Sequence, residues 1–148
     1  MSSQVAEVAA PQAARAAAYA GLLEQTKQMA DRYDSFPLKG AFSLALLADM
    51  RGLVAAREGR TVDALGAFTE ARAALRALGL DYTAAYCGVD AAVLLPGNAA
   101  ARDLAEQGRP VFERLRARPW LTLLDGVATR HRPVEAGAAG AVTTSARL

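Results

Sequence analysis

The segment from Glu58 to Gly79 constrains the fold of this chain more than any other part of it. The segment opens with a Gly-Arg turn and continues with small and large apolar residues at helical spacing. Ala64, Phe68 and Ala71 recur at intervals of four and three residues, so their side chains leave one face of a helix. Gly52, on the preceding helix, lets a neighbouring element approach closely. The pattern predicts a helical hairpin packed through a small-large-small stripe.

The rest of the sequence favours helices as well. It is rich in alanine, leucine and arginine, which are strong helix formers, and it lacks the alternating β-branched runs that indicate strands. We expect an all-α fold of about six helices, with antiparallel hairpins stacked as a short α-α superhelix. The predicted helices cover 11–33, 38–57, 61–78 and 82–94, a fifth capped by Asn98 and a short last helix opened by Pro119. Pro110 predicts a kink or a break near residues 107–109.

The expected domain organisation is simple. A chain of 148 residues is predicted to form one domain, which we place at 11–131. Residues 1–10 have little pattern and are expected to be flexible, and residues 132–148 are small and polar and are expected to be disordered.

Composition and charge exclude several classes of protein. The net charge is only +2, with both signs interspersed, so no nucleic-acid-binding patch is expected. The single cysteine, Cys87, allows no intrachain disulfide, and no apolar run is long enough for a membrane span. We therefore expect a cytoplasmic protein that binds neither membrane nor nucleic acid directly.

No motif predicts an enzyme, a cofactor or a metal site. Phosphate-binding glycine loops and zinc-protease motifs are absent from the sequence. His131 and Cys87 lack the partners that a nucleophilic or metal site needs, and Asp31 and Asp34 are expected to be solvated at a helix end. Three arginines near the end of the fifth helix favour either contact with phosphate or with an acidic partner or, more simply, the negative end of the helix dipole: Arg114, Arg116 and Arg118.

One unit of the chain resembles the tetratricopeptide repeat, a helical hairpin of 34 residues. Five small or aromatic residues between Ala45 and Leu78 fall on matching positions of that unit: Gly52, Gly59, Ala64, Phe68 and Ala71. The longer string from about residue 15 to 128 also resembles the C-terminal repeat region of bacterial ATPase-linked regulators, including adenylate/guanylate cyclase-type and helix-turn-helix transcriptional regulators. The segments on which this second resemblance rests are Leu75–Ala85 and Ala101–Leu121.

The resemblance implies a non-catalytic module that binds a protein or peptide, as a regulatory or scaffolding tail in bacterial signalling or transcription regulation. Asp49, Leu53 and Arg57 recur at four-residue intervals and would face the concave groove in which relatives hold a peptide. So short an array is also expected to have one end covered, by another domain or by a second copy in a homo-oligomer. Two alternatives stay open: a fragment of a nucleotide-binding or cyclase-type regulator whose catalytic domain lies outside this chain, and a small-molecule sensor with a cavity near Phe68 and Tyr86.

Overall fold

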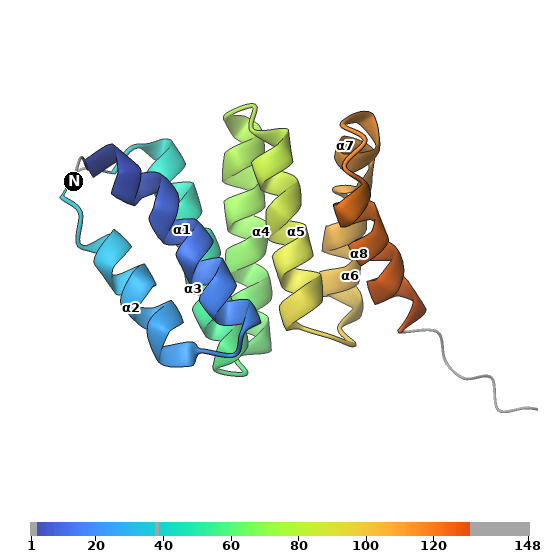
Figure 1. Cartoon of the computed structure of the whole chain (residues 1–148), viewed down its shortest axis with the longest axis horizontal. Coiled ribbons are helices and arrows are strands. Elements are labelled where there is room, and N and C mark those ends of the chain that lie inside the picture. Colours follow the sequence, from blue (N-terminus) through green and yellow to red (C-terminus); the bar gives the residue numbers. More distant parts are fainter. Residues whose placement is uncertain (1–2, 38, 131–148) are drawn as a thin grey trace, which may run out of the picture.

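The computed structural model describes residues 3–37 and 39–130, and these residues form eight helices and no strand (Figure 1). The prediction of an all-α fold is therefore confirmed, while the superhelical stacking stays a prediction. No helix among these residues has both the length and the apolar character needed to cross a bilayer. In chain order the helices are α1 (Ser3–Tyr19), α2 (Leu23–Asp34), α3 (Ala41–Arg57), α4 (Thr61–Ala77), α5 (Asp81–Leu94), α6 (Ala99–Glu106), α7 (Arg109–Arg114) and α8 (Arg118–Thr129).

The helices form hairpins that repeat every 38 residues. Gly21, Gly59 and Gly97 follow one another at that interval, and each has a positive φ in the turn inside a hairpin. The hairpins are α1 with α2, α3 with α4, and α5 with the pair α6 and α7, which together take the place of one helix. The first helices of successive hairpins also contact one another, α1 with α3 and α3 with α5. The observed interval is four residues longer than the predicted unit of 34.

The predicted helix over 11–33 is wrong, because it is divided into α1 and α2. Gly21 adopts the left-handed conformation at φ +79°, and its N–H donates to the carbonyl of Ala18 at 3.1 Å, which ends α1. The apolar stripe continues on both sides of this turn, so helical periodicity alone does not reveal it. Pro11 consequently lies inside α1 rather than in its first turn, and residues 3–10, which the sequence places outside any helix, belong to α1.

The end of the array follows the sequence prediction closely. The Asn98 side chain accepts a hydrogen bond from the Ala101 N–H at 3.0 Å and caps α6. The predicted break occurs between α6 and α7, at Gln107 and Gly108. Pro119 lies in the first turn of α8. The proposed disordered tail at 132–148 and His131 lie outside the described residues.

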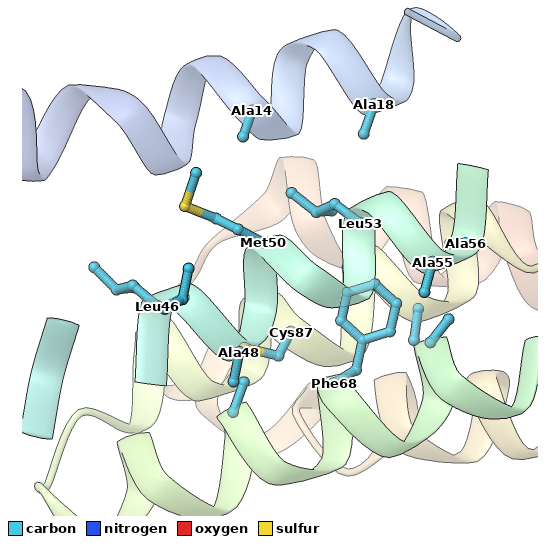
Figure 2. Packing of buried hydrophobic residues seen from close by; sticks show 14 of the residues in the cluster. Ala14, Ala18, Leu46, Ala48, Met50, Leu53, Ala55, Ala56, Phe68 and Cys87 are labelled. Carbon is cyan, nitrogen blue, oxygen red and sulfur yellow. The ribbon is translucent and has the colours of Figure 1, made fainter. Parts of the chain in front are cut away.

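The main core is built around the close approach of α3 and α4 (Figure 2). Phe68 of α4 is fully buried and points at α3, where an ideal Cβ on Gly52 would lie only 2.7 Å from the ring. On the other side of α3, Met50 and Leu53 point toward α1. Gly52 thus lets α4 approach α3 closely on one side of α3. On the other side, the larger side chains of α3 face α1.

A second cluster joins α5 to the end of the chain. Its largest buried side chains are Val89, Phe112 and Leu124, from α5, α7 and α8. Gly88 is a second point of close approach, because an ideal Cβ there would lie 2.5 Å from the carbonyl oxygen of Leu104. The two clusters share α5, which is buried along most of its second half.

Gly52→Ala should destabilise the protein by about 1–3 kcal/mol, because the added methyl overlaps the buried Phe68 ring. Gly66→Ala on α4 is the matched control, since no atom lies within 4 Å of a Cβ at that position. That variant should gain up to about 1 kcal/mol from the better helix propensity of alanine. Urea unfolding of both variants measures the difference, and equal effects would contradict the close approach.

Candidate recognition site

A buried ionic cluster connects the first helices of the three hairpins. Nε of Arg15 on α1 lies 2.8 Å from both carboxylate oxygens of Asp90 on α5. Nη2 of the same arginine lies 3.0 Å from Oδ2 of Asp49 on α3. The hydroxyl of Tyr19 donates a further hydrogen bond to Asp90. One arginine therefore holds α1 against two other helices.

The two carboxylates of this ionic cluster are withdrawn from water. Asp49 is 1% exposed and Asp90 is fully buried, while Arg15 is 8% exposed. Buried charges are tolerated only where they are paired and hydrogen-bonded, and Arg15 meets that need for both aspartates. The ionic cluster thus fixes the position of α1, and removal of its only cation would leave two carboxylates without a counter-charge.

Burial also changes how the two aspartates bind protons. Desolvation and, after it, the negative charge of Asp90 raise the pKa of Asp49 from 3.8 to about 7, against the opposing effect of Arg15. Burial likewise raises the pKa of Asp90. Oδ1 of Asp49 is buried without a hydrogen-bond partner, so a proton there would remove an unsatisfied charge. Below neutral pH, the ionic cluster therefore tends toward one cation and one anion.

Aromatic rings surround the outer side of the ionic cluster. The Arg15 guanidinium lies 5.0 Å from the ring centroid of Tyr86, which is a cation–π distance. The Tyr86 ring also contacts Trp120 of α8 at 4.3 Å and Phe112 of α7 at 6.4 Å between centroids. The indole N–H of Trp120 donates to the hydroxyl of Tyr82 at 3.1 Å. These contacts hold the two tyrosines in fixed positions.

Arg15, Tyr82 and Tyr86 form one wall of a half-open pocket of about 190 Å³, which we call the aromatic pocket. It lies where α1, α3 and α5 meet. Two of its aromatic lining side chains are left substantially exposed, Phe42 at 43% and Tyr82 at 39%. The full lining is Pro11, Gln12, Arg15, Phe42, Leu46, Tyr82, Thr83 and Tyr86. The arrangement offers an apolar recess with hydroxyl and amide groups at its edge, on a base fixed by the ionic cluster.

The predicted binding stripe is not an open surface. Asp49 and Leu53 are buried on the side of α3 that faces α1, and Leu53 points toward α1 in Figure 2. Only Arg57 is exposed. Helix α1 packs against this side of α3 and covers it. Asp49 and Leu53 therefore cannot contact a partner while α1 is in place, and a binding role for Arg57 stays a prediction.

The other candidates from the sequence lie elsewhere. Asp31 and Asp34 are exposed on α2, and Asp34 pairs with Arg51 and Lys39. Cys87 is buried, and desolvation together with the nearby Asp49 and Asp90 charges raises the pKa of its thiol, which disfavours the reactive thiolate. Among the described residues, no three histidine, cysteine or carboxylate side chains gather as metal ligands would.

Sequence reasoning missed Arg15 and Asp90, although a signal was present. Asp90 and Asp49 each interrupt an otherwise apolar run, and an acidic residue in such a run requires a cation. The sequence does not reveal which arginine supplies the charge, because Arg15 and Asp90 are separated by 75 positions.

No family model, curated protein or solved structure matches this chain.

Arg15→Met should destabilise the protein by about 3–5 kcal/mol at pH 8, because both buried carboxylates lose their cation. The loss should shrink at pH 5, where protonation can neutralise them. Arg32→Met, which changes an exposed arginine on α2 with no ion pair in the described residues, should have little effect. Urea unfolding at both pH values tests this, and a small loss at pH 8 would contradict the bridging role.

Asp49→Asn should flatten the dependence of stability on pH. A folded-state pKa raised to about 7 means that the native state binds a proton more tightly than the unfolded chain. The resulting stabilisation is complete below about pH 4 and is lost as pH rises through about 7. Asparagine cannot ionise, so the variant should lose less stability over this window, as thermal unfolding at successive pH values will show. The exposed change Asp103→Asn is the control, and an unchanged slope in Asp49→Asn would refute the assignment.

Proposed function

We propose that this chain is a non-catalytic, tetratricopeptide-like helical-hairpin module that binds a protein segment in the aromatic pocket. As the resemblance in sequence implies, it would serve as a cytoplasmic regulatory or scaffolding part of a bacterial signalling or transcription regulator. The support for the family assignment is physical. The small-large-small pattern of the repeat predicts helical hairpins in which a large side chain packs against a small residue. The hairpins of this chain repeat, and Phe68 packs against Gly52 in this way.

The observation that carries the binding proposal is the exposure of Phe42 and Tyr82 beside a recess with rigid walls. Exposed aromatic side chains around a concave apolar site are typical of binding hot spots, which are enriched in tyrosine and tryptophan. Arg15, Trp120 and Phe112 hold the Tyr86 wall in place without a ligand. A partner would therefore meet a preorganised surface, which limits the entropy lost on binding.

The size of the pocket favours a side chain over a metabolite. Small-molecule sites generally occupy about 300–1,000 Å³, and the aromatic pocket holds about 190 Å³. This volume suits one apolar or aromatic side chain of a peptide. The cavity expected for a small-molecule sensor near Phe68 is not supported either, because the Phe68 ring is fully buried in close packing against Gly52.

A catalytic role for the two buried aspartates is disfavoured by their surroundings. A raised pKa and a neighbouring carboxylate are features of acid–base sites. Asp49 and Asp90 are nonetheless closed off from solvent, and Arg15 occupies the side that faces the pocket. They stabilise the wall of the aromatic pocket and cannot reach a substrate within it.

Selection from a random peptide library displayed on phage should enrich peptides that carry an aromatic or large aliphatic residue. Phe42→Ser and Tyr82→Ser should each weaken binding of an enriched peptide about tenfold, because each removes an exposed apolar contact. Val62→Ser on α4 is the matched control, since Val62 is 83% exposed and lies away from the pocket. Peptides that bind all three variants and the unaltered chain equally would refute the proposed site.

A further inference from the structure

We propose that the chain also binds a phosphate group in a second pocket, the arginine pocket, which lies between α4 and the break that separates α6 from α7. This pocket of about 240 Å³ is lined by Arg72 and Arg76 of α4 and by Arg114 at the end of α7. Gln107, at the break, adds an amide. The arginine pocket shares no lining residue with the aromatic pocket, so the two sites are independent.

The three arginines of this pocket have no anionic partner in the described part of the chain. No ion pair joins Arg72, Arg76 or Arg114 to a carboxylate there, whereas Arg15, Arg51, Arg60 and Arg109 each form at least one. A different pocket of about 460 Å³, between α2, α3 and α4, illustrates the contrast. Its cations Lys27, Arg51 and Arg60 all have acidic partners. The arginine pocket thus differs from this pocket in that none of its three arginines forms an ion pair within the described residues.

Arg72 shows most directly that an acceptor is missing. Its Nε is buried and has no hydrogen-bond partner, which is rare for a charged donor. Burial lowers the pKa of this arginine, and the positive charge of Arg76, one turn away on α4, lowers it further. Both effects would be relieved by an anion that accepts from Arg72 and lies between the two guanidinium groups.

The number and kind of charges favour phosphate over a carboxylate. Three guanidinium groups present planar forks of donors from two helices, and a tetrahedral phosphate has enough oxygens to accept from all three. A carboxylate has only two oxygens. Asp81 also lines the pocket but forms no ion pair with the arginines in the described residues, so three cations and one anion leave a formal charge of +2. A phosphate dianion balances that charge.

The floor of the arginine pocket is rigid and made of small residues. Ala84 and Ala85 of α5 are buried, and they meet Gly108 at the break. An ideal Cβ on Gly108 would lie 2.9 Å from the Cβ of Ala85, so the break is packed directly against α5. The break in the helix therefore gives the pocket a compact floor, and Arg114 lines the same pocket as the two arginines of α4.

Calorimetric titration of the full chain with inorganic phosphate, at constant ionic strength in chloride, tests the proposal. We expect saturable binding at one site, and at least tenfold weaker binding in Arg76→Gln and Arg114→Gln. Both side chains are exposed, so these variants should fold, and thermal unfolding without phosphate checks that they do. Arg118→Gln removes the same charge outside the pocket and should bind as the unaltered chain does.

Further arms identify the ligand chemistry and its source. Succinate should bind at least tenfold more weakly than phosphate, because it is a dicarboxylate. Tighter binding of O-phosphoserine than of inorganic phosphate would assign the site to phosphate esters, and the reverse order would assign it to free phosphate. Equal binding of succinate and phosphate would overturn the proposal. An equal loss of phosphate affinity in Arg118→Gln and in the pocket variants would overturn it as well. None of these results depends on peptide binding in the aromatic pocket.

Discussion

Close approach between helices at glycine is the constraint on which the rest of this structure depends. At Gly52 the ring of Phe68 occupies the space of a side chain, and at Gly88 the backbone of α6 does the same. Each glycine lies on the first helix of a hairpin and meets the second helix of that hairpin. The opposite side of each first helix is then free for larger side chains to contact the neighbouring hairpin. The aromatic pocket lies where α1, α3 and α5 meet, and the arginine pocket lies between α4 and the break that separates α6 from α7.

The sequence revealed local structure well. Small and large residues at helical spacing identified the hairpin of α3 and α4, and Asn98 and Pro110 correctly marked a cap and a break. These features depend on residues within a few positions of one another. The turn at Gly21 was missed because the apolar stripe runs through it without a change of period. Local pattern therefore predicts helices more reliably than it predicts their number.

The candidate sites were much less accessible to sequence reasoning. Asp49 was singled out, but as an exposed groove residue, because helical spacing cannot show that α1 lies over that face. The ionic cluster and the arginine pocket each bring together residues from helices far apart in the sequence. Arg114 was noted as one of a run of basic residues. That it lines the same pocket as Arg72 depends on the tertiary arrangement of the helices, which no local pattern encodes.

The contact between Arg15 and Asp90 has a consequence for the way this array unfolds. Stacked hairpins interact mainly with their neighbours, so such arrays can fray from either end. Here a charge on the first hairpin is neutralised by the third, across 75 positions of sequence. Loss of the first hairpin would remove the cation of the ionic cluster, and loss of the third would remove one of its two carboxylates, so melting at either end loses the stabilisation of this contact. A linear assembly of local units thereby acquires the cooperativity of a single globular core.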